Sequence, residues 1–267
     1  MALDWPAGQG QLIAGGKSLE WGAFGPDPSC GRAVIVMLHE GLGCLALWRD
    51  FPAQIARHTG HPVFAYSRAG YGQSDLTALP RPLDYMSREA VESLPDVLAA
   101  TGADSYIMFG HSDGATIAAV YAGLVDDARL RGLILMAPHF FTEPMGLAEI
   151  EKARTAFQET DLKARMAKYH RDPEVAFRGW NVAWLDPAFK ALYVASAIDS
   201  FQVPTLVLHG REDQYGTMAQ LQEVEQRSPA AVELVVLEAC RHSPQVDQPE
   251  ATLAAVSAFM ARLDRMS

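Results

Sequence analysis

The chain has 267 residues, of which 49% are hydrophobic and 20% charged, and its formal net charge is -10. This composition is typical of a globular domain with a large core, and it argues against a disordered chain. The acidic balance argues against a nucleic-acid partner, because phosphate binding needs clusters of Lys and Arg that are missing here.

The cysteines and the N-terminal segment indicate the cellular compartment of the protein. Cys30, Cys44 and Cys240 are an odd number of cysteines in a long chain, and they match neither a disulfide framework nor a spaced metal-binding motif. Residues 1–30 show no basic segment followed by an apolar one, and no run approaches the ~20 apolar residues that span a bilayer. We therefore expect free thiols in a reducing cytoplasm and no membrane partner.

Apolar runs alternate with helix-compatible segments along most of the chain. Gly15 and Gly16 predict a hairpin turn between residues 11–14 and 18–24. Ser87 predicts the start of a helix that Pro95 kinks, and Gln220 predicts a capping box with Thr217. Buried strands are predicted at residues 33–38, 62–66, 106–109, 132–136, 205–209 and 232–237, and helices at residues 48–58, 87–100, 115–124, 217 onward and 249–263. Such alternation implies right-handed crossovers and a mostly parallel, doubly wound sheet.

The alternation stops between the strands at 132–136 and 205–209. Helical patterns occur there at residues 147–158, 162–169, 174–184 and 188–197, with no convincing strand between them. These segments have their own apolar periodicity and aromatic residues, so they are not a linker. The sequence therefore predicts a helical cap at residues 142–200, inserted into an α/β core formed by residues 1–141 and 201–267.

A G-x-S-x-G motif stands between the strand predicted at 106–109 and the helix predicted at 115–124. It runs from Gly110 to Gly114 with Ser112 at its centre. A side chain at either glycine would collide with the neighbouring strand or helix, and the serine would take a strained conformation that exposes its hydroxyl. In this context the motif predicts a nucleophile; the alternative is a glycine-rich turn with a capping serine.

A serine hydroxyl needs a base, usually a histidine that a carboxylate holds in one tautomer. Asp213 follows the predicted strand at 205–209, and His242 follows the last predicted strand. The carboxyl ends of parallel strands lie at one edge of a sheet, where active residues of α/β proteins are found. The order Ser112, Asp213, His242 thus predicts a catalytic triad.

The same motifs, in this order, resemble those of an α/β-hydrolase with a helical cap, over nearly the full length. The loop at residues 39–43, the glycine-rich segment 67–75 and the segment 210–213 add to the resemblance. It implies that Ser112 is the nucleophile, His242 the general base and acid, and Asp213 the carboxylate that orients His242. Glu143 is an alternative to Asp213, because some of these hydrolases take the acid from the loop after the strand that follows the serine.

The resemblance also implies an oxyanion hole, formed by the backbone amides of Asp113 and of Gly41 or Leu42. Glu40 departs from the family pattern, which usually has a second small residue after the loop histidine, and Asp113 is unusual beside a nucleophile. Two alternatives stay open for both carboxylates. Either they select the substrate by charge, or they have a structural role, with Glu40 paired to Arg68 or to backbone amides and Asp113 turned toward the helix N-terminus.

Other candidates lie at strand ends and in the predicted cap. His39, His111 and His209 favour packing or loop hydrogen bonds, and no histidines and carboxylates are spaced as a metal site. We expect no cofactor. Residues predicted to line a substrate pocket are Glu40, His139, Trp180 and Trp184, although aromatic side chains at helical spacing also fit the core of the cap itself.

These features predict a serine hydrolase for a small or medium acyl substrate, first of all a carboxylic ester, with carboxylesterase-like chemistry. Hydrolysis of a carbon–carbon, thioester or lactone bond would use the same triad, because specificity lies in the cap. Haloalkane dehalogenase and epoxide hydrolase chemistry is disfavoured, since both use a carboxylate where this chain has Ser112. A hydrolase-like binding protein is the alternative from another class. The oligomeric state is left open, with a homodimer as one option.

Overall fold

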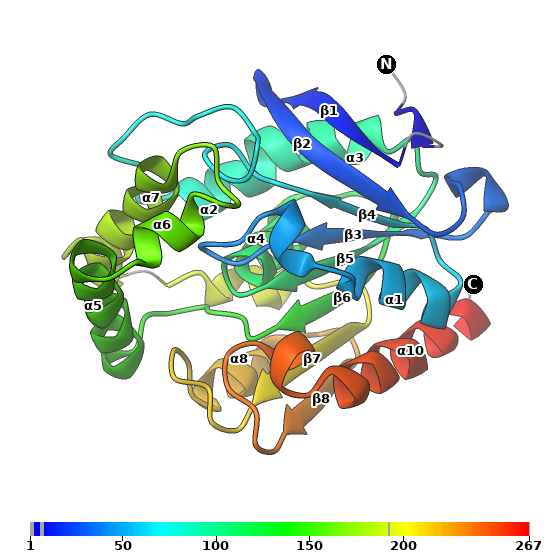
Figure 1. Ribbon diagram of the computed structural model, residues 1–267. Helices are drawn as coiled ribbons and strands as arrows, with labels where there is room; N and C mark the ends of the chain where they lie inside the picture. The colour runs from blue at the N-terminus through cyan, green and yellow to red at the C-terminus, as the bar shows by residue number, and fades with distance from the viewer. Residues whose placement is uncertain (1–2, 6–7, 192, 267) are drawn as a thin grey trace.

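The computed structural model describes residues 3–5, 8–191 and 193–266. Within these residues, eight strands form one sheet in the order β1-β2-β4-β3-β5-β6-β7-β8 (Figure 1). The strands β1 and β2 pair antiparallel, as do β2 and β4, and every other neighbouring pair is parallel. The strands are β1 (Gln9–Ala14), β2 (Lys17–Phe24), β3 (Val34–Leu38), β4 (Val63–Tyr66), β5 (Tyr106–His111), β6 (Leu130–Met136), β7 (Thr205–Gly210) and β8 (Val232–Leu237).

The sheet confirms the predicted doubly wound α/β class. Every residue of β3, β4, β5 and β7 is buried, which explains their continuous apolar sequences. The β1–β2 hairpin turns at Gly15 and Gly16, whose φ values are 55° and 71°. Both values suit the tight turn that the glycine pair predicts.

Helices cover both faces of the sheet (Figure 1). The helices α1 (Phe51–Thr59) and α10 (Pro249–Met266) pack on one face, in a hydrophobic cluster that includes Ile35 and Met37 of β3. The opposite faces of the strands, with Val34, Val36 and Leu38 of β3, join a second cluster with α3 (Leu94–Ala100), α4 (Asp113–Leu124) and α8 (Ala219–Arg227). The alternate residues of one strand therefore belong to two cores, one on each side of the sheet.

Two helices predicted in the first half of the chain are each divided into more than one element in the structure. The helix predicted at 48–58 is a 3₁₀ turn, η3 (Leu45–Trp48), followed by α1. The helix predicted to start at Ser87 begins earlier, with α2 (Tyr85–Arg88), and passes through a π turn, η4 (Glu89–Ser93), before α3. The Leu94 amide bonds to the carbonyl of Glu89, five residues back, and Pro95 follows without an N–H to offer.

The chain between β6 and β7 is helical, with an isolated β-bridge between Phe141 and Tyr193. Figure 1 shows α5, α6 and α7 together beyond one end of the strands. The helix predicted at 188–197 is instead two short 3₁₀ segments, and residue 192 lies outside the described residues. The elements are α5 (Pro144–Glu159), α6 (Leu162–Met166), α7 (Pro173–Leu185), η5 (Phe189–Ala191) and η6 (Ala195–Ser200). The division into a core and a cap stays a prediction.

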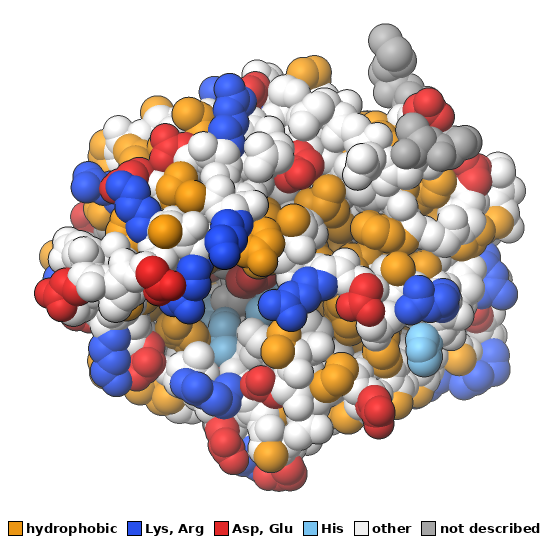
Figure 2. Space-filling view, in the orientation of Figure 1, with side chains coloured by type: hydrophobic (Ala, Val, Ile, Leu, Met, Phe, Trp, Pro, Cys, Tyr) orange, Lys and Arg blue, Asp and Glu red, His pale blue; other side chains and the backbone are white. Residues whose placement is uncertain are grey.

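The remaining short elements are η2 (Pro28–Cys30) and α9 (Pro244–Asp247). Among the helices of the described residues, none combines the length and the apolar character needed to cross a membrane. Figure 2 shows Lys and Arg side chains interspersed with Asp and Glu on the face that it presents, where histidine atoms lie recessed in a hollow.

Candidate active site

Ser112 lies at the tip of the turn between β5 and α4, with φ 54° and ψ -118°. This is a strained conformation for a residue with a side chain. A Cβ atom on Gly110 would come within 2.3 Å of the Gly114 carbonyl oxygen, and one on Gly114 within 2.1 Å of the Leu38 carbonyl oxygen. The turn can therefore be this tight only with glycine on both sides of the serine, as the sequence predicts.

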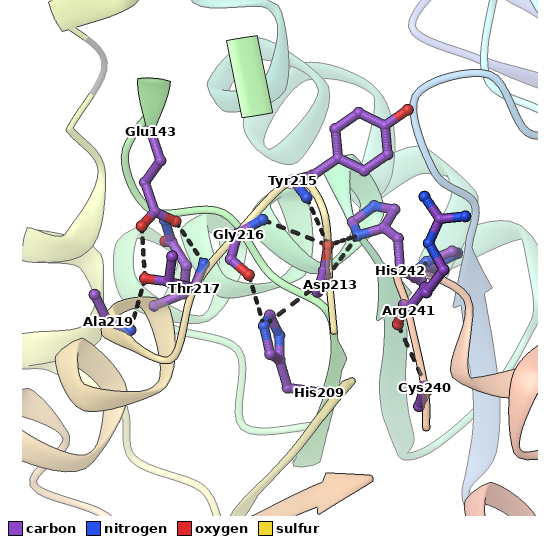
Figure 3. Close-up of polar contacts among 12 residues, drawn as sticks. Glu143, His209, Asp213, Tyr215, Gly216, Thr217, Ala219, Cys240, Arg241 and His242 are labelled. Carbon is purple, nitrogen blue, oxygen red and sulfur yellow. Dashed lines mark hydrogen bonds and ion pairs between the residues drawn. The ribbon is translucent and has the colours of Figure 1, made fainter. Parts of the chain in front are cut away.

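His242 and Asp213 meet as the strand order predicts. Nδ1 of His242 donates to Asp213, at 2.8 Å from Oδ2 and 3.0 Å from Oδ1 (Figure 3). An ionised carboxylate only accepts hydrogen bonds, so the proton of a neutral His242 is on Nδ1 and its Nε2 is free to accept one. Burial raises the pKa of Asp213, but the hydrogen bonds from His242 and from the Tyr215 amide outweigh it and hold the pKa below its usual value.

Ser112 and His242 line one cavity of about 100 Å³. In the described part of the chain no hydrogen bond joins the Ser112 hydroxyl to the His242 ring. Such contacts often tighten only when a substrate binds. The other lining residues are Glu40, Gly41, Leu42, His139, Glu143, Gly146, Leu147, Ile150, Trp180, Trp184 and Tyr215.

The amides predicted to bind an oxyanion come from two elements. Gly41 and Leu42 lie in the loop after β3 and line the cavity. Asp113 is the first residue of α4, and the amides of a helix's first turn have no acceptor within the helix. Trp180 covers the loop so closely that a Cβ atom on Gly41 would lie 2.3 Å from its ring. Amide groups of both elements are thus available near Ser112.

Glu40 lines the cavity, and its carboxylate lies against the ring of a histidine. Its Oε2 lies 3.5 Å from Nδ1 of His111, whereas Arg68 donates to the main-chain carbonyl of Glu40 at 3.1 Å and not to the carboxylate. Burial raises the pKa of Glu40, but His111 and Arg68 outweigh it, and the pKa is lowered. Of the structural options for the Glu40 carboxylate, pairing with Arg68 is therefore wrong.

Asp113 does not line the cavity with its side chain. The carboxylate is fully buried and accepts a hydrogen bond from the Tyr85 hydroxyl, which in turn accepts one from Nε1 of Trp184 at 3.1 Å. Burial raises the pKa of Asp113, and the nearby charge of Arg68 opposes this shift. Of the two alternatives for this carboxylate, the geometry favours the structural one.

Glu143 has other partners than His242 (Figure 3). Its carboxylate accepts hydrogen bonds from the Thr217 amide at 2.7 Å, the Thr217 hydroxyl at 2.6 Å and the Gln220 side chain at 3.0 Å. The predicted capping box is wrong, because Gln220 accepts from the Phe140 amide and Glu143 takes its place at Thr217. The carboxylate that contacts the histidine is that of Asp213.

The three other predicted pocket residues, His139, Trp180 and Trp184, also line the cavity. The ring of His139 lies 5.4 Å from that of His242 and 5.5 Å from that of Trp184. Burial, together with the charge on His242, lowers the pKa of His139 to about 3, so this ring is neutral near pH 7.

Sequence reasoning missed the part of the wall formed by Gly146, Leu147 and Ile150 of α5, and it missed Tyr215. The ring of Tyr215 lies 4.7 Å from that of His242. Its position two residues after Asp213 was the available signal. The apolar face of α5 gives no hint of whether it meets a core or a cavity.

Comparison with known proteins identifies a matching family and similar folds. A family model described as "Hydrolase_4: Serine aminopeptidase, S33" matches residues 30–249. The fold is similar to that of 2-hydroxy-6-oxo-6-phenylhexa-2,4-dienoate hydrolase from Rhodococcus sp. strain RHA1, with a TM-score of 0.75 and 17% identity over 96% of this chain and 99% of that one. The enol-lactonase from Burkholderia xenovorans LB400 gives a TM-score of 0.73 and 20% identity, over 94% and 100%. At these identities the likeness shows the α/β-hydrolase fold alone.

Sequence relatives match over a shorter segment. The pig protein named 1-acylglycerol-3-phosphate O-acyltransferase ABHD5 is 32% identical over 121 residues, which are 45% of this chain and 34% of that protein. The human (lyso)-N-acylphosphatidylethanolamine lipase is 32% identical over 111 residues, which are 41% and 31%. The match thus spans about a third of the length of these relatives.

Proposed function

Because the chain belongs to the α/β-hydrolase family described as serine aminopeptidase, S33, we propose that it is a serine hydrolase that cleaves a small or medium acyl substrate, in the first place a carboxylic ester. The observation that carries the proposal is that Ser112 and His242 line one cavity while Asp213 is hydrogen-bonded to His242. Ser112 stands on its strained turn, and His242 is held by Asp213 and faces the same space.

The chemistry follows from these positions. The Ser112 hydroxyl attacks the carbonyl carbon while Nε2 of His242 takes its proton. The negative charge on the carbonyl oxygen is stabilised by the amides of Asp113 and of Gly41 or Leu42. His242 then gives the proton to the leaving alcohol, and an acyl group stays on the serine. Water, activated by His242, attacks the acyl carbon and releases the acid.

The cavity supports a short or compact acyl group. It holds about 100 Å³, and its walls are formed largely by Leu147, Ile150, Trp180 and Trp184. Apolar walls exclude water from the reacting carbonyl and give no partner to a second charged group of a substrate. Glu40 adds a carboxylate to the wall, so we expect neutral esters to react faster than matched esters that carry a free carboxylate.

The experiment is a turnover assay of the full-length protein with chromogenic esters of increasing acyl length, a thioester, a lactone, a dienoic carbon–carbon substrate and an aminoacyl anilide. Ser112→Ala should lower kcat by ~10⁶ and keep the fold, since the triad acts as a unit. The exposed Ser29 provides the control, and Ser29→Ala should behave like the wild type.

A serine-directed phosphonylating reagent should label Ser112 in the wild type and nothing in the Ser112→Ala variant. Full activity of Ser112→Ala would refute the nucleophile. Ligand binding without turnover of any member of the panel would instead make the protein a hydrolase-like binding protein.

A further inference from the structure

A second carboxylate and a second imidazole lie beside the proposed triad. His111 directly precedes Ser112, and its Nε2 is 2.8 Å from the main-chain oxygen of His242. On the other side of the ring, Nδ1 is 3.5 Å from Oε2 of Glu40. The rings of His111 and His242 have centroids 5.2 Å apart. The His111 side chain is 1% exposed, and the Trp48 ring also lies beside it, with centroids 6.2 Å apart.

The two contacts of His111 require hydrogen on particular atoms. A main-chain carbonyl only accepts hydrogen bonds, so Nε2 of His111 carries a hydrogen and donates it to His242. In a neutral ring, Nδ1 would then present its lone pair to the carboxylate of Glu40, and two acceptors would face each other. The contact is attractive only when Nδ1 carries a hydrogen that faces the carboxylate.

This arrangement connects the two loops on which the reaction depends. His242 lies in the loop between β8 and α9, and Asp213 fixes one ring nitrogen of its side chain. His111 holds the main chain of the same residue. Glu40 immediately precedes Gly41, in the loop that supplies the proposed oxyanion amides. Both loops are thereby tied to the end of β5, next to the nucleophile.

We propose that Glu40 and His111 are a pair of positioning residues for the hydrolysis, in which Glu40 orients the His111 ring and His111 fixes the main chain of His242. This inference rests on the proposed function. Neither residue touches the reacting atoms in this role. Their effect is on the distance between Nε2 of His242 and the Ser112 hydroxyl, where a misplacement of ~1 Å costs on the order of 100-fold in rate.

Two variants of His111 separate its two contacts. The amide nitrogen of Gln reaches the place of Nε2, and that of Asn reaches the place of Nδ1. His111→Gln therefore keeps a donor for the His242 carbonyl, whereas His111→Asn loses it. We expect His111→Gln to keep kcat within about threefold of the wild type, and His111→Asn to lower kcat on the order of 100-fold. KM for a neutral ester should change by less than about threefold in both variants.

Two variants of Glu40 test the other half of the pair, on a side chain that is 29% exposed. The amide of Glu40→Gln can donate to Nδ1 of a neutral His111, so this variant should retain kcat within about threefold. Glu40→Ala leaves the ring without that partner and should lower kcat on the order of 10-fold. Active sites are counted with the phosphonylating reagent, so that kcat refers to folded protein.

The possible outcomes distinguish a failure of the positioning pair from a failure of the proposed function. Equal kcat in His111→Asn and His111→Gln, or a wild-type kcat in Glu40→Ala, would overturn the positioning role. Ser112→Ala is measured alongside: if it is active, the proposed function fails, whereas an inactive Ser112→Ala with equal His111 variants refutes only the pair.

Discussion

Replacing His139 with Gln should reduce the acid sensitivity of the fold. His139 is 3% exposed, and burial and the charge on His242 lower its pKa to about 3. In the unfolded chain a histidine has a pKa of about 6.5. Between these two values the unfolded chain binds more protons than the native protein, so the free energy of unfolding falls as the pH falls. The stabilisation by neutral His139 is complete when the pH is above the unfolded pKa, and it is lost as the pH falls toward the folded pKa.

The size of the effect follows from the two pKa values. A single group that titrates at about 6.5 unfolded and about 3 folded lowers the free energy of unfolding by about 2 kcal/mol between pH 8 and pH 5. In a domain of this size that corresponds to a fall of about 4–8 °C in Tm. The contribution of Asp213, whose folded pKa is depressed, is lost only below the unfolded carboxyl value of about 3.9 and leaves this window unaffected.

The assay is urea unfolding at both pH values for the wild type, His139→Gln and His58→Gln. His58 is exposed on α1 and provides the matched control. Other groups that titrate, among them the buried His39 with its lowered pKa, are common to all three proteins and cancel in the differences. The loss of stability should be about 2 kcal/mol smaller in His139→Gln than in the other two. Equal losses in all three would refute the assigned state of His139.

The remaining predictions concern the triad acid and the turn. Asp213→Asn should lower kcat by ~10⁴ by favouring the wrong histidine tautomer, whereas Glu143→Gln should leave kcat within about tenfold and lower Tm. The reverse order of the two kcat values would make Glu143 the acid. Gly114→Ala, whose Cβ would lie 2.1 Å from a carbonyl oxygen, should destabilise the fold by more than about 3 kcal/mol in urea unfolding. Gly102→Ala, strained at φ +67° but meeting no described atom within 4 Å, should cost about 1 kcal/mol, and equal losses would contradict the steric account.

The parallel core and the serine turn could be predicted because both depend on local patterns. Strands that are buried on both faces are continuous apolar runs, and the turn needs glycine wherever a Cβ atom would strike the main chain. The capping box at Gln220 was wrong for the opposite reason. The Thr217 amide bonds to Glu143, a residue from elsewhere in the fold, instead of to Gln220.

The sequence left two acids for His242, and only the three-dimensional contact between Asp213 and Nδ1 distinguishes them. The partner of Glu40 also could not be predicted from the sequence. His111 faces it because β3 and β5 pair in parallel, with Leu38 opposite Gly110, and this brings the residues that follow the two strands side by side. A strand pairing of this kind links positions that are distant along the chain, and no local pattern records it.

Trp184 both lines the cavity and supports the turn that carries Ser112, which matters for any redesign of the cavity. Its ring forms part of the wall, while its Nε1 bonds to the buried hydroxyl of Tyr85, the donor to Asp113. Shortening Trp184 to admit longer acyl groups would deprive that hydroxyl of a partner directly behind the nucleophile. Mutant libraries aimed at wider substrate range are better directed to Leu147 and Ile150, whose side chains have no polar atoms. Substitutions at these two positions can change the substrate range without disturbing the turn that carries Ser112.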